Sequence, residues 1–298
     1  MGRAVERGID NARSKRGGIE TGSSLLSGDA REASERFFDF FSVDPAADDP
    51  LLLRRLIAAF SRIPYENLSK IIKQTETGSA PRFRLPPEVL QDHIEHRLGG
   101  TCFSLTHFFQ KILTAAGFEA YRVMAHMRAG RNIHCAVVVC LPEGRVLIDP
   151  GYGLNRPVPL RTDAPVRFAS RHGGVELRYD ADTDEYHLFT YMARERKWRY
   201  CFADRPVPDD EFERHWIDSF SKPSLHQICL YRASPQGHLY LRKHHLRLTT
   251  FRGQQKENVR ETLHKTVKDY FGISPVWVDR AREVLEERKA GRSPDPAP

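Results

Sequence analysis

Apolar residues in the first 120 positions recur at the three- and four-residue spacing of helices that bury one face. A phenylalanine cluster follows Ala33, and Pro64, Gly99-Gly100 and Gly117 are residues of the kind that end helices. The segments predicted to be helical after this cluster are 51–61, 87–97 and 102–116, the last with Thr101 as its N-cap. Residues 1–32 are mostly small and polar, without periodicity, and we expect them to form a disordered arm.

Beyond residue 117 the spacing of apolar positions changes to the alternation typical of strands. The predicted strands are 120–127, 133–141, 145–149, 174–180, 186–193, 197–203, 226–232 and 238–248. Two further helices, about 256–271 and 276–289, are expected before a polar tail. Helices followed by strands and then by a mixed segment predict an α+β fold, with a helical N-terminal domain and a sheet or barrel after it.

The composition indicates a globular protein in a reducing compartment. The chain has 298 residues, of which 40% are hydrophobic. Its longest wholly apolar run, Cys135–Leu141, is far shorter than the roughly 20 residues of a membrane-spanning helix. Residues 1–30 lack the apolar core of a secretory signal, and the five cysteines form no CxxC pair. We therefore expect a cytoplasmic protein with free thiols and without a membrane partner.

Charge does not single out a nucleic-acid-binding protein. Lysine and arginine outnumber aspartate and glutamate by 46 to 39, a net charge of +7, but no zinc finger or RNA-binding motif is present. The densest basic segment, 242–247, has the alternation of a solvated strand or hairpin. His93 and His96 lie three apart in a predicted helix, where a solvated face is favoured because further ligands at zinc spacing are missing. We predict no metal and no nucleic-acid partner.

Three residues between positions 102 and 149 suggest nucleophilic catalysis when they are taken together. Cys102 follows Gly99-Gly100-Thr101 at the start of a predicted helix, where unpaired amides and the helix dipole favour a thiolate. His134 heads a buried strand, and Asp149 ends the next strand before a glycine-rich turn. Alone, each has an ordinary structural explanation: a buried thiol, a strand-end histidine and a turn-forming carboxylate. Together, a thiol, an imidazole and a carboxylate in this order occur in papain-like folds.

The predicted hairpin brings His134 and Asp149 to the same face of the sheet, although the sequence leaves the hairpin register open. A loop over Cys140–Glu143 would place the two residues directly opposite each other. A two-residue loop at Glu143-Gly144 would place position 153 opposite His134, with Asp149 on the same face but too far away to touch.

Four ordered motifs resemble those of the arylamine N-acetyltransferase family. The matching segments are Ile63-Pro64-Tyr65-Glu66-Asn67-Leu68, Gly99-Gly100-Thr101-Cys102-Phe103, His134 and Ile148-Asp149-Pro150-Gly151-Tyr152-Gly153. They correspond to the family's Ile-Pro-(Phe/Tyr)-Glu-Asn-Leu stretch, its Arg-Gly-Gly-x-Cys-(Phe/Leu)-Glu motif, its histidine and its Val-Asp-x-Gly-(Phe/Tyr)-Gly motif. Weaker similarity at 219–224 and 270–273 extends the resemblance over roughly residues 34–288. The chain departs from the family pattern at Leu98 in place of arginine, Ser104 in place of glutamate and Thr106 in place of asparagine.

The resemblance implies a helical bundle over residues 33–117, a β-barrel over 118–205, an α/β lid over 206–290 and a tail over 291–298. It also implies that Cys102 accepts an acyl group, that His134 is its base and that Asp149 orients the histidine. Gly151, Gly153 and Ser221 would lie near a coenzyme.

The activity that the resemblance implies is transfer of an acetyl group from acetyl-CoA, through a thioester on the cysteine, to the nitrogen of an arylamine or hydrazine. The expected partners are therefore an acyl-CoA and a small-molecule amine. Three alternatives stay open: an amide synthase or a thiol hydrolase with the same three residues, and a non-catalytic binding protein that kept the fold.

Overall fold

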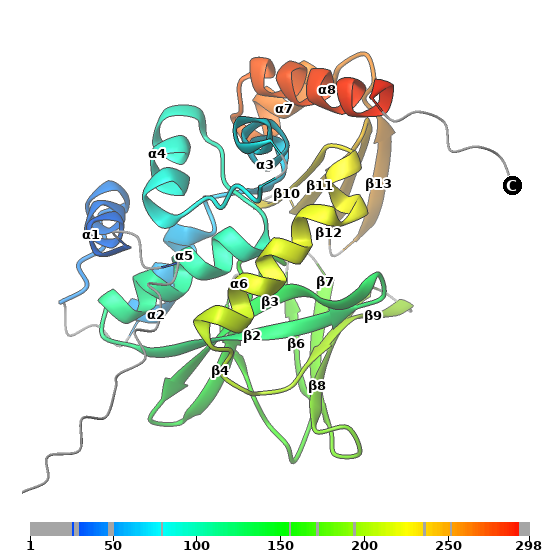
Figure 1. The fold of residues 1–298 in the computed structure, drawn as a ribbon. Coiled ribbons are helices and arrows are strands. Elements are labelled where there is room, and N and C mark those ends of the chain that lie inside the picture. Colours follow the sequence, from blue (N-terminus) through cyan, green and yellow to red (C-terminus); the bar gives the residue numbers. More distant parts are fainter. Residues whose placement is uncertain are drawn as a thin grey trace, which may run out of the picture.

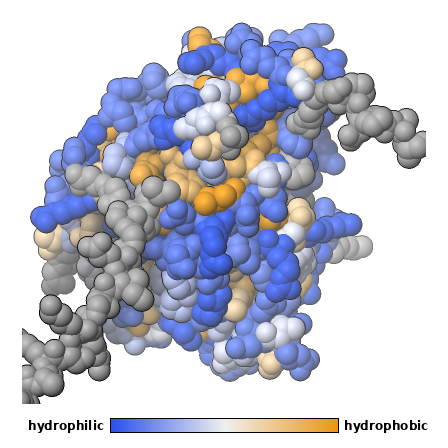
Figure 2. All heavy atoms as spheres, in the orientation of Figure 1, coloured by the Kyte–Doolittle hydropathy of each residue, from blue (hydrophilic) through white to orange (hydrophobic). Residues whose placement is uncertain are grey.

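The computed structural model describes residue 26 and the ranges 30–46, 51–78, 80–154, 156–170, 173–192, 195–234, 237–250 and 252–291. These residues form a helical layer, a curled sheet beside it, and a second sheet with two helices (Figure 1). The expected mixture of helical and strand regions is confirmed. The face in Figure 2 is mostly hydrophilic, with its apolar area concentrated in the upper middle. No helix in the described part is long and apolar enough to cross a membrane.

The helical layer is built around its last helix, whose side chains are buried on nearly all sides. Its helices are α1 (Ala30–Phe41), α2 (Leu52–Phe60), α4 (Pro86–His96) and α5 (Cys102–Ala115), whereas the buried side chains of α3 (Leu68–Lys73) belong to the core of the second sheet. Phe108 of α5 packs its ring against Phe37 of α1 and Phe60 of α2, at ring-centroid distances of 6.0 and 5.5 Å. Burial of these rings fixes α5, and with it the position of its first residue, Cys102.

The N-terminal arm is shorter than the predicted 1–32. Helix α1 begins at Ala30, and Leu26 is only 1% exposed. Leu26 belongs to a buried apolar cluster with Phe103, Phe212 and Trp216. One anchoring side chain produces no periodicity, so the sequence pattern did not indicate it. The remainder of the predicted arm, 1–25 and 27–29, and the tail from 292 onward lie outside the described residues.

The strands after α5 form an eight-stranded antiparallel sheet that curls toward a barrel, in the order β5-β4-β3-β2-β9-β8-β7-β6 (Figure 1). They are β2 (Glu119–Met127), β3 (Gly130–Leu141), β4 (Gly144–Ile148), β5 (Val158–Pro159), β6 (Val166–Ser170), β7 (Gly173–Asp180), β8 (Glu185–Met192) and β9 (Glu195–Phe202). Alternate side chains such as Val123, Leu188 and Tyr200 are fully buried in its interior. The six predicted strands of this region are confirmed with small shifts, whereas β5 and β6 were not predicted.

The β3–β4 hairpin adopts neither of the two registers considered from the sequence. Leu141 pairs with Gly144, so Pro142-Glu143 form the loop. Continuing this register places position 151 opposite His134, two residues beyond Asp149. Side chains two apart lie on the same face of a strand, and diagonal neighbours remain within reach of a long side chain. Asp149 is therefore close enough to His134 for a hydrogen bond.

A second antiparallel sheet lies beside the barrel, in the order β1-β10-β11-β12-β13. Its strands are β1 (Tyr65–Glu66), β10 (Cys229–Ser234), β11 (Gly237–Arg242), β12 (His245–Thr250) and β13 (Gly253–Asn258). Helix α6 (Asp209–Asp218) links the barrel to this sheet, while α7 (Leu263–Phe271) and α8 (Pro275–Ala290) pack on its apolar face, which includes Leu230 and Leu241. The opposite face, with Tyr231 and Tyr240, is turned toward the barrel.

Two predictions for the C-terminal third were wrong. The expected single strand 238–248 is a hairpin, because Lys243 adopts a left-handed backbone conformation (φ 56°) between the paired Arg242 and His245. The predicted helix 256–271 begins only at Leu263, since the polar segment 253–258 pairs with β12 as an edge strand. An edge strand without apolar alternation has no strand signal in sequence. The predicted helix 276–289 is confirmed as α8, whereas α3 and α6 were not predicted.

Candidate active site

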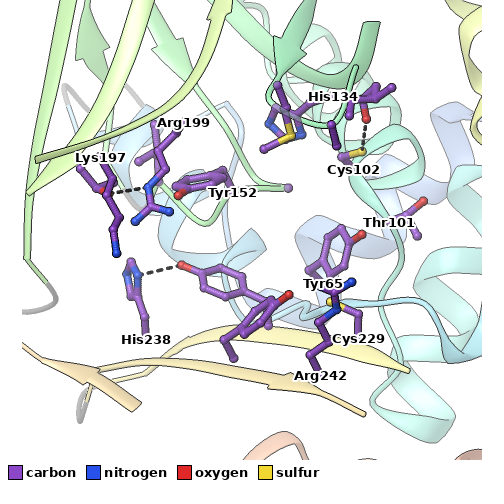
Figure 3. A pocket seen from close by; sticks show the side chains of 18 of the residues that line it. Tyr65, Thr101, Cys102, His134, Tyr152, Lys197, Arg199, Cys229, His238 and Arg242 are labelled. Carbon is purple, nitrogen blue, oxygen red and sulfur yellow. Dashed lines mark hydrogen bonds between the residues drawn. The ribbon is translucent and has the colours of Figure 1, made fainter. Parts of the chain in front are cut away.

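A cavity of about 790 Å³ lies between the barrel and the second sheet. Thr101 and Cys102 line one side of it with Tyr65 close by, and Lys197 and Arg199 lie across the cavity (Figure 3). Clefts of this size, walled by apolar and aromatic side chains with a few polar groups, are typical of small-molecule sites. The cavity therefore brings a small molecule within reach of the Cys102 thiol.

The position of Cys102 depends on close backbone contacts at the turn before α5. Gly100 forms a parallel bridge with Tyr65 of β1. At Gly99, a Cβ atom would lie 1.8 Å from the Pro64 carbonyl oxygen, so only glycine fits. The chain then enters α5 at Cys102, which is 8% exposed, with its sulfur 3.8 Å from the Ile133 carbonyl oxygen. The thiol is thus held at a helix N-terminus at the edge of the cavity.

His134 and Asp149 form a buried hydrogen-bonded pair beside this thiol. His134 Nε2 lies 2.7 Å from Asp149 Oδ2, and Asp149 Oδ1 accepts a 2.7 Å hydrogen bond from the Tyr152 amide. The carboxylate is fully buried, and the Tyr200 ring packs on the imidazole at 5.1 Å. Since Nε2 is engaged by Asp149, Nδ1 is the nitrogen available to Cys102. The structure therefore brings together the three residues that the sequence indicated.

The surroundings of Cys102 lower the pKa of its thiol. A hydrogen bond from the Cys135 thiol lowers the pKa, burial opposes this effect, and contact with His134 and the positive charges of His134 and Lys70 lower it further. At His134, burial lowers the pKa, but the Asp149 carboxylate and Cys102 overcome this effect and raise the pKa to about 10. At neutral pH the pair is therefore a thiolate beside an imidazolium, which is the reactive form of a cysteine.

Lys70 is a further charged residue near the thiol, and no sequence motif indicated it. It lines the cavity from α3 and donates a 2.6 Å hydrogen bond to the Ser219 hydroxyl. Burial lowers its pKa to about 7, although negative charge at Cys102 and Cys135 works in the opposite direction. Lys70 is thus a cation that stabilises negative charge on the nearby sulfur while losing its own proton readily.

Gly151, the first of the three residues expected near a coenzyme, packs directly on the catalytic candidates. It lines the cavity, and a Cβ atom there would lie 2.7 Å from Cys102 Cβ and 3.3 Å from His134 Cε1. A side chain at this position would fill the space in which an acyl group on the sulfur has to fit. Glycine therefore keeps the thiol accessible.

The other two expected residues are not part of the cavity lining. Gly153, with φ 71°, lies against the ring of Tyr231, where a Cβ atom would come within 2.4 Å of it. Ser221 is exposed, and its hydroxyl donates a 2.9 Å hydrogen bond to the Asp218 carbonyl oxygen. Lys222, the next residue, lines the cavity instead.

A buried network of charged side chains holds the glycine turn before α5. The fully buried Glu66 carboxylate accepts hydrogen bonds from the Ser69 amide at 2.9 Å and the Gly99 amide at 3.3 Å. Arg84, 3% exposed, donates to the Gly99 carbonyl oxygen. Its guanidinium also lies 3.5 Å from Glu66 and 2.5 Å from Asp92. Glu66 thus binds the amide of the turn, and Arg84, paired with Glu66 and Asp92, binds its carbonyl oxygen.

Arg84 could not be recognised from the sequence. The family motif has its arginine at position 98, but Leu98 is fully buried among the apolar residues of the second sheet and helices α7 and α8. Arg84 reaches the turn from the loop before α4 instead. The other two departures keep local hydrogen bonds, since Ser104 donates to the Thr101 carbonyl at 3.1 Å and Thr106 to the Cys135 carbonyl at 3.1 Å.

The solvated helix face expected for His93 and His96 was wrong for His93, which is 4% exposed, whereas His96 is half-buried. His93 Nδ1 bonds to the Leu98 carbonyl oxygen at 2.9 Å, and burial lowers its pKa to about 4. Among the described residues, one group of three could offer ligands: Glu185, His187 and Cys201, whose ligand atoms lie within 4.8 Å of one another. None of these three lines the cavity, so a metal there would not touch a ligand bound beside the thiol.

An activated thiol, an imidazole and a carboxylate at the wall of a cavity form the arrangement used by enzymes that transfer acyl groups through a cysteine. The sequence model of the family described as N-acetyltransferase matches residues 52–278, more than half of the chain. The chain therefore belongs to the arylamine N-acetyltransferase family and is an acetyltransferase enzyme.

Solved structures of arylamine N-acetyltransferases share this fold at low sequence identity. The enzyme from Mycobacterium abscessus has 19% identity and a TM-score of 0.72 over 88% of this chain and 98% of that chain. The Salmonella typhimurium enzyme has 19% identity and a TM-score of 0.68 over 86% and 98%. The Mycobacterium marinum enzyme, in complex with CoA, has 21% identity and a TM-score of 0.67 over 85% and 96%. No curated protein is similar enough to this chain to count as a match.

Proposed function

We propose that the protein transfers an acetyl group from acetyl-CoA to the nitrogen of an arylamine or hydrazine, through a thioester on Cys102. The observation that carries the proposal is the buried series of contacts from Asp149 through His134 to the Cys102 thiol at the cavity wall. The CoA complex of the Mycobacterium marinum relative supports acetyl-CoA as the donor.

In the first half-reaction the Cys102 thiolate attacks the carbonyl carbon of the acetyl thioester. The bond between this carbon and the CoA sulfur breaks, and the departing thiolate takes a proton from His134. This step leaves an acetylated cysteine, a neutral imidazole and free CoA. The low thiol pKa supports attack at neutral pH, because the nucleophile is already ionised.

In the second half-reaction the amine nitrogen attacks the same carbon. The bond to the Cys102 sulfur breaks, and His134 takes the proton that the nitrogen loses. Asp149 then stabilises the imidazolium and keeps its ring oriented through the 2.7 Å hydrogen bond. The thiolate and imidazolium are restored, so protons and charges balance over the cycle.

Two-substrate kinetics test this proposal. A covalent intermediate predicts parallel lines in double-reciprocal plots, with slow acetyl-CoA hydrolysis that an aromatic amine or hydrazine accelerates. Cys102→Ser should abolish both reactions. Intersecting lines together with no acetylated protein in the mass spectrum would indicate direct transfer in a ternary complex. Hydrolysis that no amine accelerates would indicate a thiol hydrolase.

A further inference from the structure

Positive charge is in excess along the cavity wall. Besides two histidines, the lining has six lysine or arginine side chains and one acidic side chain, namely Lys70, Lys197, Arg199, Lys222, Arg242 and Arg247 against Glu195. The one acid is paired with Lys197 at 2.8 Å. In the described part of the chain, no carboxylate forms an ion pair with Arg199 or Arg247. The same holds for Arg242, but that side chain is exposed and lies against the Gln227 amide, so Arg199 and Arg247 are the two half-buried arginines of the cavity wall.

Both arginines are half-buried and incompletely hydrogen-bonded. Arg199 of β9 donates through Nε to the Thr190 hydroxyl at 2.6 Å, which leaves its terminal nitrogens to the cavity. Arg247 of β12 lies over the Tyr240 ring at 4.8 Å, and its Nε is buried without a partner among the described residues. Removing unpaired charge from water is costly, and such charges are normally paired with an opposite charge. An anion bound between these side chains would balance both charges.

The arginines lie close to the residues around the thiol. Burial raises the pKa of both Tyr152 and Tyr231, and the positive charges of Arg199 and Arg247 act against it at both hydroxyls. Tyr152 in turn lies next to His134, with ring centroids 6.3 Å apart, and Figure 3 shows it between Arg199 and the histidine. The thiol and both arginines therefore line the same cavity, with Tyr152 between Arg199 and His134.

We propose that Arg199 and Arg247 bind a carboxylate of the substrate itself, carried by the acyl group or by the acceptor amine. This inference rests on the proposed function. Two planar guanidinium groups match a carboxylate with paired N–H donors. A short molecule at Cys102 reaches them, whereas the pantetheine arm of CoA holds the phosphates far from the thioester.

The acceptor side is tested by binding, which does not need turnover. The protein is titrated calorimetrically with 4-aminobenzoate and with 4-aminobenzamide, which has nearly the same shape without the charge. We expect the anion to bind roughly tenfold or more tightly, as for hydrogen bonds between charged groups. Arg199→Gln and Arg247→Gln should each remove most of this preference. Arg178→Gln is the control, because it removes one positive charge from an exposed position of β7 outside the cavity.

The donor side is tested with thioesters that carry no phosphate. Succinyl and butyryl thioesters of N-acetylcysteamine differ in a terminal carboxylate against a methyl group, and the rate at which each loads Cys102 is followed by intact-mass spectrometry. If the succinyl thioester acylates Cys102 faster than the butyryl thioester, and this difference is lost in Arg199→Gln and in Arg247→Gln, the carboxylate belongs to the acyl group. Equal loading, together with preferential binding of 4-aminobenzoate, assigns it to the acceptor.

Two results would overturn the inference. One is equal binding of the benzoate and benzamide together with equal loading of the two thioesters. The other is a protein that shows neither carboxylate preference and whose Arg199→Gln and Arg247→Gln variants bind CoA more weakly. The two arginines would then bind the phosphates of the coenzyme. Failure of the proposed function is a separate result: no thioester acylates Cys102, whatever the binding preference.

Discussion

Replacing Asp149 with asparagine removes the charge that keeps a proton on His134 and preserves the shape of the side chain. The amide oxygen can still accept the hydrogen bond from the Tyr152 amide. Burial by itself lowers the pKa of His134, and it is chiefly Asp149 that raises it from 6.5 to about 10. This rise in pKa means that the folded protein favours the imidazolium over the neutral imidazole by a free energy on the order of 5 kcal/mol. In Asp149→Asn the imidazole should therefore be neutral at pH 7.

A neutral His134 no longer stabilises the Cys102 thiolate. The hydrogen bond from Cys135 and the charge of Lys70 still lower the pKa of the thiol, and burial still opposes them, so the pKa should rise by the loss of the His134 contribution alone. Each unit by which the thiol pKa then exceeds the pH lowers the thiolate fraction, and with it the rate of alkylation by iodoacetamide, about tenfold. The wild-type rate should stay level between pH 6 and 8, whereas the rate of the variant should rise with pH until the thiol ionises.

A surface pair provides the matched control for this experiment. His264 Nε2 lies 2.7 Å from Asp279 Oδ1, and both side chains are exposed. Asp279→Asn should leave the rate and pH profile of Cys102 alkylation unchanged, and thermal unfolding checks that both variants are folded. Identical pH profiles for Asp149→Asn and the wild type would refute the reasoning, because Asp149 would then only form the turn.

Three further predictions concern the support of the thiol. Arg84→Lys keeps the charge but loses the forked hydrogen bonds to the Gly99 turn and Asp92. Urea denaturation should therefore show a free energy of unfolding roughly 2–4 kcal/mol lower than in the wild type. A decrease of less than about 0.5 kcal/mol would contradict the view that Arg84 holds the turn. Gly151→Ala should slow acylation of the thiol at least about tenfold, because its Cβ would lie 2.7 Å from Cys102 Cβ, whereas Gly291→Ala, with its nearest atom at 3.5 Å, should not. In Cys102→Ser the free energy of unfolding should decrease as pH rises above about 6.5 and level off below pH 10, since Asp149 still holds a proton on folded His134 that the unfolded chain has lost, while the contribution of Cys102 to the pKa of His134 is gone. In the wild type this slope should be absent between about pH 6.5 and 8.5, where the folded ion pair and the unfolded chain bind equal numbers of protons.

Much of the helical layer and the barrel followed from hydrophobic spacing. Helix α5 and strands β2 to β4 have many buried side chains, and burial produces the periodicity that predicts them. Cys102 and His134 lie in these elements and Asp149 directly follows β4, which is why the sequence indicated these residues together. By contrast, β13 is a polar edge strand whose pairing with β12 leaves no pattern.

The parts of the site that the sequence did not reveal come from residues far apart in the chain. Arg84 reaches the Gly99 turn from a loop, and its role depends on packing that no spacing encodes. The alternation of the segment 242–247 predicts a solvated strand or hairpin, yet Arg242 and Arg247 line the cavity. Strand alternation shows which residues share a face, but it does not show which face meets the barrel.

Isolation of the acyl-enzyme tests the central claim most directly. The protein is mixed with one equivalent of acetyl-CoA, digested at low pH and mapped by mass spectrometry, and a second portion receives an aromatic amine before digestion. The account predicts one acetyl group on the peptide that contains Cys102, none on the peptides with the other four cysteines, and its quantitative recovery on the amine after the chase. An acetyl group on another residue, or an unmodified Cys102 in a protein that still acetylates the amine, would contradict it.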